Sequence, residues 1–431
     1  MGRMMLLVNE HEKVLWLARR AAFGFAPGEL EQFEPKGAAA YLDRLVDPDA
    51  NGVAAAPDPF ADIVEVTDQQ DNKTRAEMIQ KFTYSWIDHM VTTPRRLDEM
   101  MTWFWHDHFA VQTAVVRSGR LMADHINLLR KNALGNFRTM AREVTTHAAM
   151  LIYLDGAKNT NRAPNENYGR EFLELFTMGI GNYTEADVRA AAVALTGWQV
   201  LLRDGARPTF NARLHETRPQ TLLGKSVNDV DSVVNTAVDH PATASFIANK
   251  IAAFFLGPDV DASLVAGFAA TFKAANFELR PLVRAVLQAG IDGKGVPIAQ
   301  SPLVWWVATR RATGVAPDPR TVVRYLDSAG QVPGSPPNVG GWPGMTAWLG
   351  ASPTAMRATL ASIAAEAVAA NSALLTAAAK GDLDRVAALL NVSSSFAPST
   401  AAAIQKLGGC GSRPGVGALT VALASPDVLV A

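Results

Sequence analysis

Residues 93–109 of the chain read TPRRLDEMMTWFWHDHF. Apolar side chains recur in this stretch at spacings of three and four residues, which is the period of one helical face. Thr93 precedes Pro94, and a capping residue followed by proline is typical of a helix start. The stretch therefore predicts a helix over 94–113, and its run of aromatic residues predicts that this helix is buried at the centre of the fold.

The same helical period continues through most of the sequence. The segment Thr184-Glu185-Ala186-Asp187 resembles a capping box and predicts one more helix start. Further helices are predicted at 74–92, 118–133, 136–150, 167–178, 230–238, 241–256, 262–275, 279–289, 301–313, 319–328 and 354–390.

Two segments break the helical pattern. Residues 198–223 contain the best strand signals and a polar Asp204-Gly205 turn, which predicts a small β-hairpin insert. Residues 331–350 contain five Gly and four Pro, so they cannot form a helix. Trp342 and Trp348 predict that this segment is an ordered loop. We expect a single, large, mainly α-helical domain over 1–431, with an Ala-rich helical tail at 365–431.

The composition excludes several classes of protein. The 431 residues are 48% hydrophobic and carry 40 basic against 41 acidic side chains, without a basic run that would bind nucleic acid. The single cysteine, Cys410, leaves only histidines and carboxylates to hold a metal. No apolar run is long enough to span a membrane, and no signal-peptide pattern is present, so we expect a cytoplasmic protein. Phosphate-loop, dinucleotide-binding, nucleophile-elbow and zinc-protease motifs are absent, so we expect no nucleotide cofactor.

A first polar cluster, His106, Asp107 and His108, lies inside the aromatic run. Polar groups in such surroundings must find partners, because an unpaired buried group costs about 1 to 3 kcal/mol. Residues two apart on a helix are rotated by about 200°, so the two imidazoles can share a ligand only where the helix ends or distorts. Otherwise each histidine has a separate structural role.

A second polar cluster lies in residues 164–179, which read PNENYGREFLELFTMG. Asn165 or Asn167 can cap the helix that follows. Glu171 and Glu174 are three residues apart, so on a helix they share a face and can chelate a cation or share a proton. Arg170 could orient Glu166 or bind an anionic substrate.

The chain resembles a large bacterial family known as domain of unknown function 1800. The resemblance covers positions 14 to about 361 and is weak beyond about 365. Two departures from the family pattern are Thr146-His147 in place of Asp-Pro and His215-Glu216 in place of His-Asp. The resemblance implies no activity, but many members are exported and are encoded beside a sulfatase-like partner. It rests on the motifs Ala18-Arg19-Arg20-Ala21-Ala22-Phe23-Gly24-Phe25, Phe104 to Phe109, Asn132 to Phe137, Pro164 to Tyr168 with Arg170-Glu171, Tyr183-Thr184 with Asp187-Val188, Leu195 to Trp198, His240 to Ala244, and Pro337-Asn338-Val339 with Gly341-Trp342-Pro343.

Our principal hypothesis is a metal-dependent enzyme, most readily a hydrolase. Helices 94–113 and 167–178 would pack so that the two clusters face each other, as in metal sites within helical bundles. The expected ligands of a Zn, Mn or Fe ion are His106, His108 and Glu171. The expected catalytic residues are Asp107, Glu166, Arg170 and Glu174, with Asp107 or Glu174 as the base that activates water.

Two alternatives remain open at the level of sequence. In the first, Asp107 and one glutamate of the second cluster act without metal as acid and base on a glycan, in a cleft lined by Trp342 and Trp348. In the second, the protein is a non-enzymatic binding or assembly protein, and the polar clusters satisfy one another inside the core. The substrate in the enzymatic hypotheses is a small molecule or a glycan.

Overall fold

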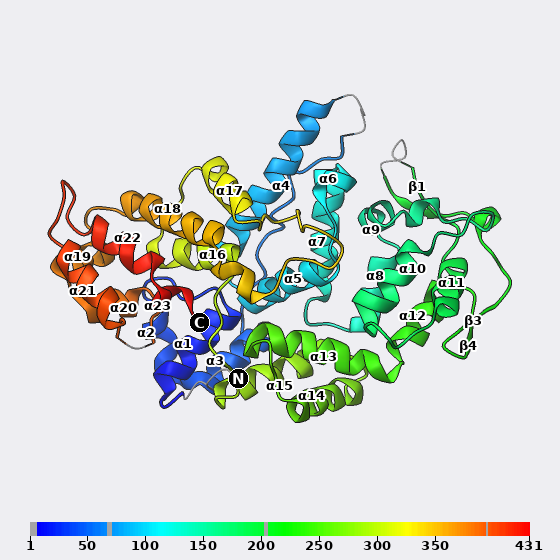
Figure 1. Ribbon diagram of the computed structural model, residues 1–431, viewed down its shortest axis with the longest axis horizontal. Coiled ribbons are helices and arrows are strands. Elements are labelled where there is room, and N and C mark those ends of the chain that lie inside the picture. The colour runs from blue at the N-terminus through cyan, green and yellow to red at the C-terminus, as the bar shows by residue number, and fades with distance from the viewer. Residues whose placement is uncertain (1–6, 67–70, 202–205, 394) are drawn as a thin grey trace.

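Helix α5 (Arg96–His108) lies near the middle of the molecule (Figure 1). The computed structural model describes residues 7–66, 71–201, 206–393 and 395–431. Helix α5 contacts α1 (Glu10–Ala21), α3 (Gly37–Val46), α4 (Asn72–Thr92) and α7 (Gly119–Asn132). Its apolar face is buried, as the periodicity predicted. The mainly α-helical fold expected from the sequence is confirmed.

The other helices extend from this centre in two directions (Figure 1). Elements α8 to α12 lie at one end of the molecule and α18 to α23 at the other, while α13 to α15 pack against one another. The remaining helices of the first half are α2 (Glu29–Phe33), η1 (Glu34–Lys36), α6 (Thr113–Val116), α8 (Phe137–Thr145), α9 (Ala148–Tyr153), η2 (Gly156–Lys158), α10 (Glu166–Glu171), η3 (Phe172–Thr177), α11 (Glu185–Ala194) and η5 (Ala212–Leu214). Those of the second half are α12 (Val230–Val238), α13 (Pro241–Leu256), α14 (Ala262–Ala274), α15 (Leu279–Ile291), α16 (Pro302–Thr313), α17 (Pro319–Ser328), η6 (Met345–Leu349), α18 (Ala351–Ala367), α19 (Ala373–Lys380), α20 (Leu383–Leu389), α21 (Pro398–Leu407), α22 (Val416–Ala424) and α23 (Pro426–Leu429).

Residues 198–223 do not form the single hairpin that we predicted. Strand β1 (Trp198–Val200) pairs with β2 (Pro208–Phe210), and β3 (Gln220–Leu222) pairs with β4 (Lys225–Val227), each antiparallel. Leu223 and Gly224 both have positive φ and form the two-residue turn between β3 and β4. Such a turn matches the strand twist, so β3 pairs locally instead of with β1. The predicted Asp204-Gly205 turn lies outside the described residues.

Several predicted helices are shorter in the structure, because local caps interrupt them. The predicted helix 94–113 begins at Arg96, two residues beyond the expected proline start, and ends at His108. The predicted helix 136–150 divides where His147 caps α9 by accepting a hydrogen bond from the Ala149 amide. The predicted helix 354–390 is three helices, α18 to α20, separated at Ser372 and Asp382, which cap the second and third.

Residues 331–350 form an ordered loop, as predicted, with the short helix η6 at its end. Trp342 and Trp348 are both buried. The loop runs past α5 and is fastened to it at the predicted polar cluster: the Gly334 amide donates to His106 Nε2 at 3.1 Å, and the Trp342 amide donates to Asp107 Oδ1 at 2.7 Å.

None of the described helices combines the length and the apolar character that crossing a bilayer requires. The expectation about the N-terminal segment falls partly on residues 1–6, which lie outside the described residues.

Candidate functional site

The two histidines of the first cluster point away from each other, as the helical rotation predicted. His106 accepts from the Gly334 amide, whereas His108 Nε2 donates to the carbonyl of Phe176 at 3.0 Å. Both imidazoles are buried, and burial holds their pKa values well below the ordinary range. Each neutral ring therefore forms a hydrogen bond to a different segment, His106 to the 331–350 loop and His108 to η3.

Asp107 lies between these histidines and faces the 331–350 loop. Burial raises the pKa of its carboxyl group, and Lys250 acts in the opposite direction. Gly341 has a φ of +85°, and a Cβ atom there would come within 2.3 Å of Asp107 Oδ1. The loop can approach Asp107 this closely only because position 341 is glycine.

The second cluster lies on α10 and on η3, a π-helix that continues it. Arg170 forms ion pairs with Glu166 at 3.3 Å and with Glu185 at 2.7 Å, all with substantial exposure to solvent. Asn165 caps α10, as one of the two predicted candidates. Arg170 therefore orients Glu166, as proposed from the sequence.

Glu171 and Glu174 interact but do not form a paired-carboxylate site with the first cluster. Burial and then the charge of Glu174 raise the pKa of Glu171. Glu174 accepts a hydrogen bond from the Tyr183 hydroxyl. The contact between the two predicted helical segments is made by His108 and a backbone carbonyl of η3, not by a carboxylate.

The predicted metal ligands do not converge in the part of the chain that the structure describes. His106 faces the loop, His108 faces η3, and Glu171 is half-buried elsewhere on the second cluster. Over the described ranges no group of three or more His, Cys, Asp or Glu side chains is placed to hold a metal ion. We therefore base no function on a metal at these residues.

Asp107 instead lines a cavity of about 380 Å³, which we call the aromatic pocket. Helices α5 and α13, the strand-like segment 298–301 and the loop 331–350 enclose it. Its apolar wall includes Trp103, Phe104, Phe254, Trp342 and Trp348. The two tryptophans that the sequence analysis assigned to a cleft therefore do line a cavity together with Asp107.

The charged side chains of the aromatic pocket are mainly cationic: Arg19, Arg20 and Lys250 line it with Asp107. Burial lowers the pKa of Arg19 to about 10 and that of Arg20 to about 9. Both guanidinium groups donate to backbone carbonyls of the 427–431 segment, and neither forms an ion pair with a described carboxylate. The pocket therefore has an excess of positive charge.

Lys250 is the pocket residue that sequence reasoning missed. Its burial lowers the pKa of the amine, and Asp107 partly opposes this. Among the described residues the amine makes no hydrogen bond or ion pair, and its nearest aromatic partner is the Phe246 ring, 5.4 Å away. The signal was available, because Lys250 is the only charged residue of the apolar segment 241–256.

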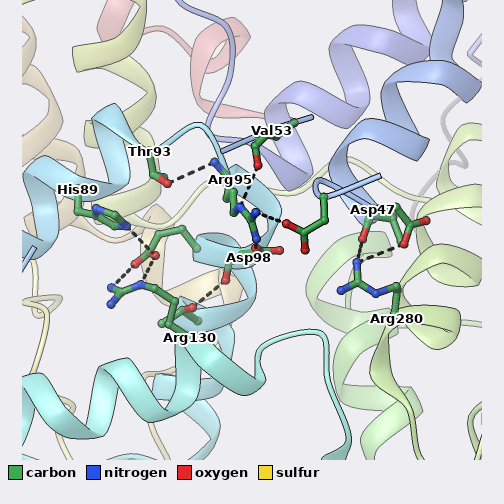
Figure 2. A network of polar contacts seen from close by, with 12 residues as sticks. Asp47, Val53, His89, Thr93, Arg95, Asp98, Arg130 and Arg280 are labelled. Atoms are coloured by element: carbon green, nitrogen blue, oxygen red, sulfur yellow. Dashed lines mark hydrogen bonds and ion pairs between the residues drawn. The ribbon is translucent and has the colours of Figure 1, made fainter. Parts of the chain in front are cut away.

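A second cavity, of about 500 Å³, lies beside the N-terminal half of α5, and we call it the polar cleft (Figure 2). Glu99 is fully buried beside it and binds Arg130 through both carboxylate oxygens, at 2.7 and 3.0 Å. Trp86 Nε1 donates to the same carboxylate, and His89 Nε2 lies 3.4 Å from it. Burial alone would raise the pKa of Glu99, but Arg130 and His89 outweigh it and hold the pKa well below its ordinary value.

Asp98 borders the same cleft and has no such partners (Figure 2). Arg95 approaches it only to 4.0 Å, while Arg95 also binds Asp49 and the Val53 carbonyl. Burial raises the pKa of Asp98 to about 6, although Arg95 and Arg280 oppose the shift. Sequence reasoning missed the cleft, because nothing in the pattern of 93–109 distinguishes these two acidic residues from a solvated helix face.

Comparison with known proteins identifies a family but no function. The family model described as Protein of unknown function (DUF1800) matches residues 16–430. No curated protein and no solved structure matches the chain. The family match continues through the Ala-rich tail, where the motifs read from the sequence were weak.

Proposed function

This chain belongs to the DUF1800 family of proteins of unknown function, and from its own geometry we propose that it binds a small organic anion with an apolar body in the aromatic pocket. The observation that carries the proposal is the pairing of an aromatic wall with an excess of cationic side chains in one cavity.

The aromatic wall of the pocket indicates that the ligand has an apolar part. Pockets for small molecules usually combine apolar and aromatic walls with a few well-placed polar groups. Trp103 and Trp342 lie with their ring centroids 4.7 Å apart, and Trp342 fastens the loop to α5 through its backbone amide. The wall is therefore held in place before a ligand binds, which lowers the entropic cost of binding.

The cationic side chains of the pocket indicate that the ligand also carries a negative charge. Buried cations without carboxylate partners are unfavourable, because desolvation penalises the charged form. Lys250 has no such partner among the described residues, and the three cationic side chains that line the pocket, Arg19, Arg20 and Lys250, outnumber its one carboxyl side chain, Asp107. An anionic group of a ligand would offset this excess of positive charge. The apolar body of the ligand would then lie against the aromatic wall.

The glycan hypothesis is less well supported by the same cavity. Acid and base catalysis on a glycosidic bond uses two carboxyl groups about 5 to 9.5 Å apart. Asp107 is the only described carboxyl side chain that lines the aromatic pocket, and Glu166, Glu171 and Glu174 do not line it. These facts favour binding of an organic anion over a two-carboxylate mechanism.

The test uses two matched fluorescent probes, anilinonaphthalene sulfonate and its uncharged relative N-phenylnaphthylamine. We expect the purified protein to bind the sulfonate more tightly. Lys250→Met should weaken sulfonate binding about tenfold, which corresponds to about 1.4 kcal/mol, and should change binding of the uncharged probe little. Lys273→Met, at an exposed position of α14, is the matched control. Equal affinity for both probes, or unchanged sulfonate binding by Lys250→Met, would contradict the proposal.

A further inference from the structure

We infer that Lys250 is a nucleophilic amine that forms an imine with a carbonyl group of the bound molecule. The inference rests on the proposed function of the aromatic pocket, and it narrows the ligand to an organic anion that carries an aldehyde or ketone. Nothing in the family description assigns such a residue.

The first support is the position of the amine. Lys250 lies on α13 and lines the aromatic pocket together with Phe254, one helical turn further on. Some lysines of this chain pair with carboxylates, as Lys131 does with Glu143 at 3.1 Å and Lys158 with Asp155 at 2.6 Å. Lys250 makes no ion pair with any described residue, so its amine lacks a carboxylate partner at close range.

The second support is the electrostatic environment. A lysine desolvated in an apolar pocket loses its proton more readily and becomes a nucleophile. Burial lowers the pKa of Lys250, whereas the carboxyl group of Asp107, which lines the same cavity, opposes the shift. The other charged groups of the cavity, Arg19 and Arg20, are cationic, and His108 is buried and neutral. The surroundings of Lys250 therefore favour its neutral form more than those of an exposed lysine.

The third support is the adjacent carboxyl group. In imine formation the lysine nitrogen attacks the carbonyl carbon, the C–N bond forms, and the carbonyl π electrons become the lone pair of an oxygen that takes up a proton. The C–O bond then breaks as that oxygen takes a second proton and leaves as water. Over the two steps the nitrogen gives up both of its protons, which balance the two that oxygen gains, and the C=N bond forms. Asp107 lines the same cavity as Lys250, and a carboxyl group there can carry protons from the nitrogen to the leaving oxygen. No external oxidant or reductant is needed for this exchange.

The experiment is reductive trapping with para-formylbenzoate, an aromatic aldehyde with an anionic group, and sodium cyanoborohydride at pH 7. Peptide mapping by mass spectrometry measures the modification of every lysine in one sample. Because exposed lysine amines are almost fully protonated at this pH, we expect Lys250 to be modified at least about tenfold faster than any other lysine. The other lysines of the chain are internal controls.

Two variants sharpen the result. Lys250→Met should abolish the selective modification, and Lys273→Met should leave it unchanged. Asp107→Asn should slow trapping at Lys250 several-fold relative to Lys273→Met, because the carboxyl group acts on proton transfer.

Competition with the sulfonate probe separates this inference from the proposed function. If para-formylbenzoate displaces the probe but Lys250 is modified no faster than the exposed lysines, the imine inference is overturned and the binding function stands. If neither compound binds, the proposed function itself is wrong, and the imine inference falls with it.

Discussion

Asp98 and Glu99 are neighbours in sequence with opposite electrostatic behaviour. Arg130 and Trp86 donate hydrogen bonds to the carboxylate of Glu99 and favour its ionised form. Asp98 is only partly buried, with 21% of its side chain exposed against 1% for Glu99, and its closest cation is 4.0 Å away. Partners within hydrogen-bond distance offset desolvation, whereas a more distant charge offsets only part of it. The two adjacent carboxyl groups thus have different pKa values, because the tertiary structure places different partners near each of them.

The raised pKa of Asp98 predicts how replacing this single residue changes protein stability with pH. Its folded pKa of about 6 exceeds the unfolded value of about 3.9. A carboxyl group with a raised folded pKa contributes stability below the unfolded pKa and loses it as pH rises through the folded pKa. Asp98→Asn should therefore stabilise the protein relative to the parent by about 2 kcal/mol at pH 8, after allowance for partial exposure, and by much less at pH 4.5.

Urea unfolding of both proteins at the two pH values measures this difference. A variant that is less stable than its parent at pH 8 would show that Asp98 is held in its ionised form.

At the scale of elements, the loop 331–350 and the end of α5 form one structural unit. The loop amides of Gly334 and Trp342 bind consecutive residues of the helix, His106 and Asp107. Helix α5 ends at His108, whose imidazole in turn holds the π-helix η3 at Phe176. π-helical turns such as η3 are frequent at functional sites. The polar cluster therefore joins three elements, two of which, α5 and the loop, line the aromatic pocket.

Substitution of a loop glycine tests this unit. Gly341→Ala would place a Cβ atom 2.3 Å from Asp107 Oδ1 and 2.5 Å from the Asp107 carbonyl oxygen, at a φ of +85°. Gly330 is the matched control, with a φ of +75° and no atom within 4 Å of the added Cβ. Gly330→Ala should cost about 1 kcal/mol of stability from backbone strain alone.

We expect Gly341→Ala to cost about 1 to 3 kcal/mol more than the control, and to weaken binding of anilinonaphthalene sulfonate while Gly330→Ala does not. Urea unfolding and fluorescence titration give the two readouts. Equal effects of both substitutions would mean that the loop does not shape the pocket.

At the scale of the whole molecule, four histidines are held neutral by their surroundings, three of them fully buried and His147 partly buried. His106 and His108 lie on α5, His125 on α7, and His147 caps α9. Burial lowers the pKa of His125 to about 3 and that of His147 to about 4. Their rings lie 5.3 Å apart, so protonation of one also disfavours protonation of the other. The folded protein thus resists proton uptake at several places at once.

This arrangement predicts acid sensitivity. Histidines with a folded pKa below the unfolded value of about 6.5 contribute stability above pH 6.5, and that stability is lost as pH falls, because only the unfolded chain takes up protons. Four such groups give a loss of at most about 5 kcal/mol per pH unit between pH 6 and pH 4.5.

The measurement is the free energy of unfolding by urea across this range, for the parent and for His125→Gln. The variant should lose stability less steeply, by about 1.4 kcal/mol per pH unit, since one proton fewer is taken up on unfolding. His11→Gln, at a partly exposed site, should keep the slope of the parent. A slope unchanged by His125→Gln would contradict the prediction.

Much of the fold follows from local patterns. The helices at 230–238, 241–256 and 319–328 have the predicted bounds, because each combines a cap or a proline start with apolar periodicity. The buried tryptophans of the 331–350 loop were also predictable, since aromatic residues favour burial over solvent. The contacts at the end of α5 were not, because the loop whose amides bind His106 and Asp107 lies more than two hundred residues away.

The candidate site was predictable only in part. Asp107 was identified from its setting in an aromatic run, and it lines the aromatic pocket. Lys250, Arg19 and Arg20 join it from segments far apart in the chain, and a single sequence does not reveal which of its charged residues converge.

The sequence by itself determined the mainly helical class, the non-helical loop and the polar cluster on α5, since periodicity, proline, glycine and capping residues act over a few neighbours. Only the tertiary structure decided that the two histidines face opposite segments and that Asp107 meets Lys250 in a cavity. The physical reason is that burial and charge pairing depend on which elements pack together, and those contacts join residues that are distant in sequence.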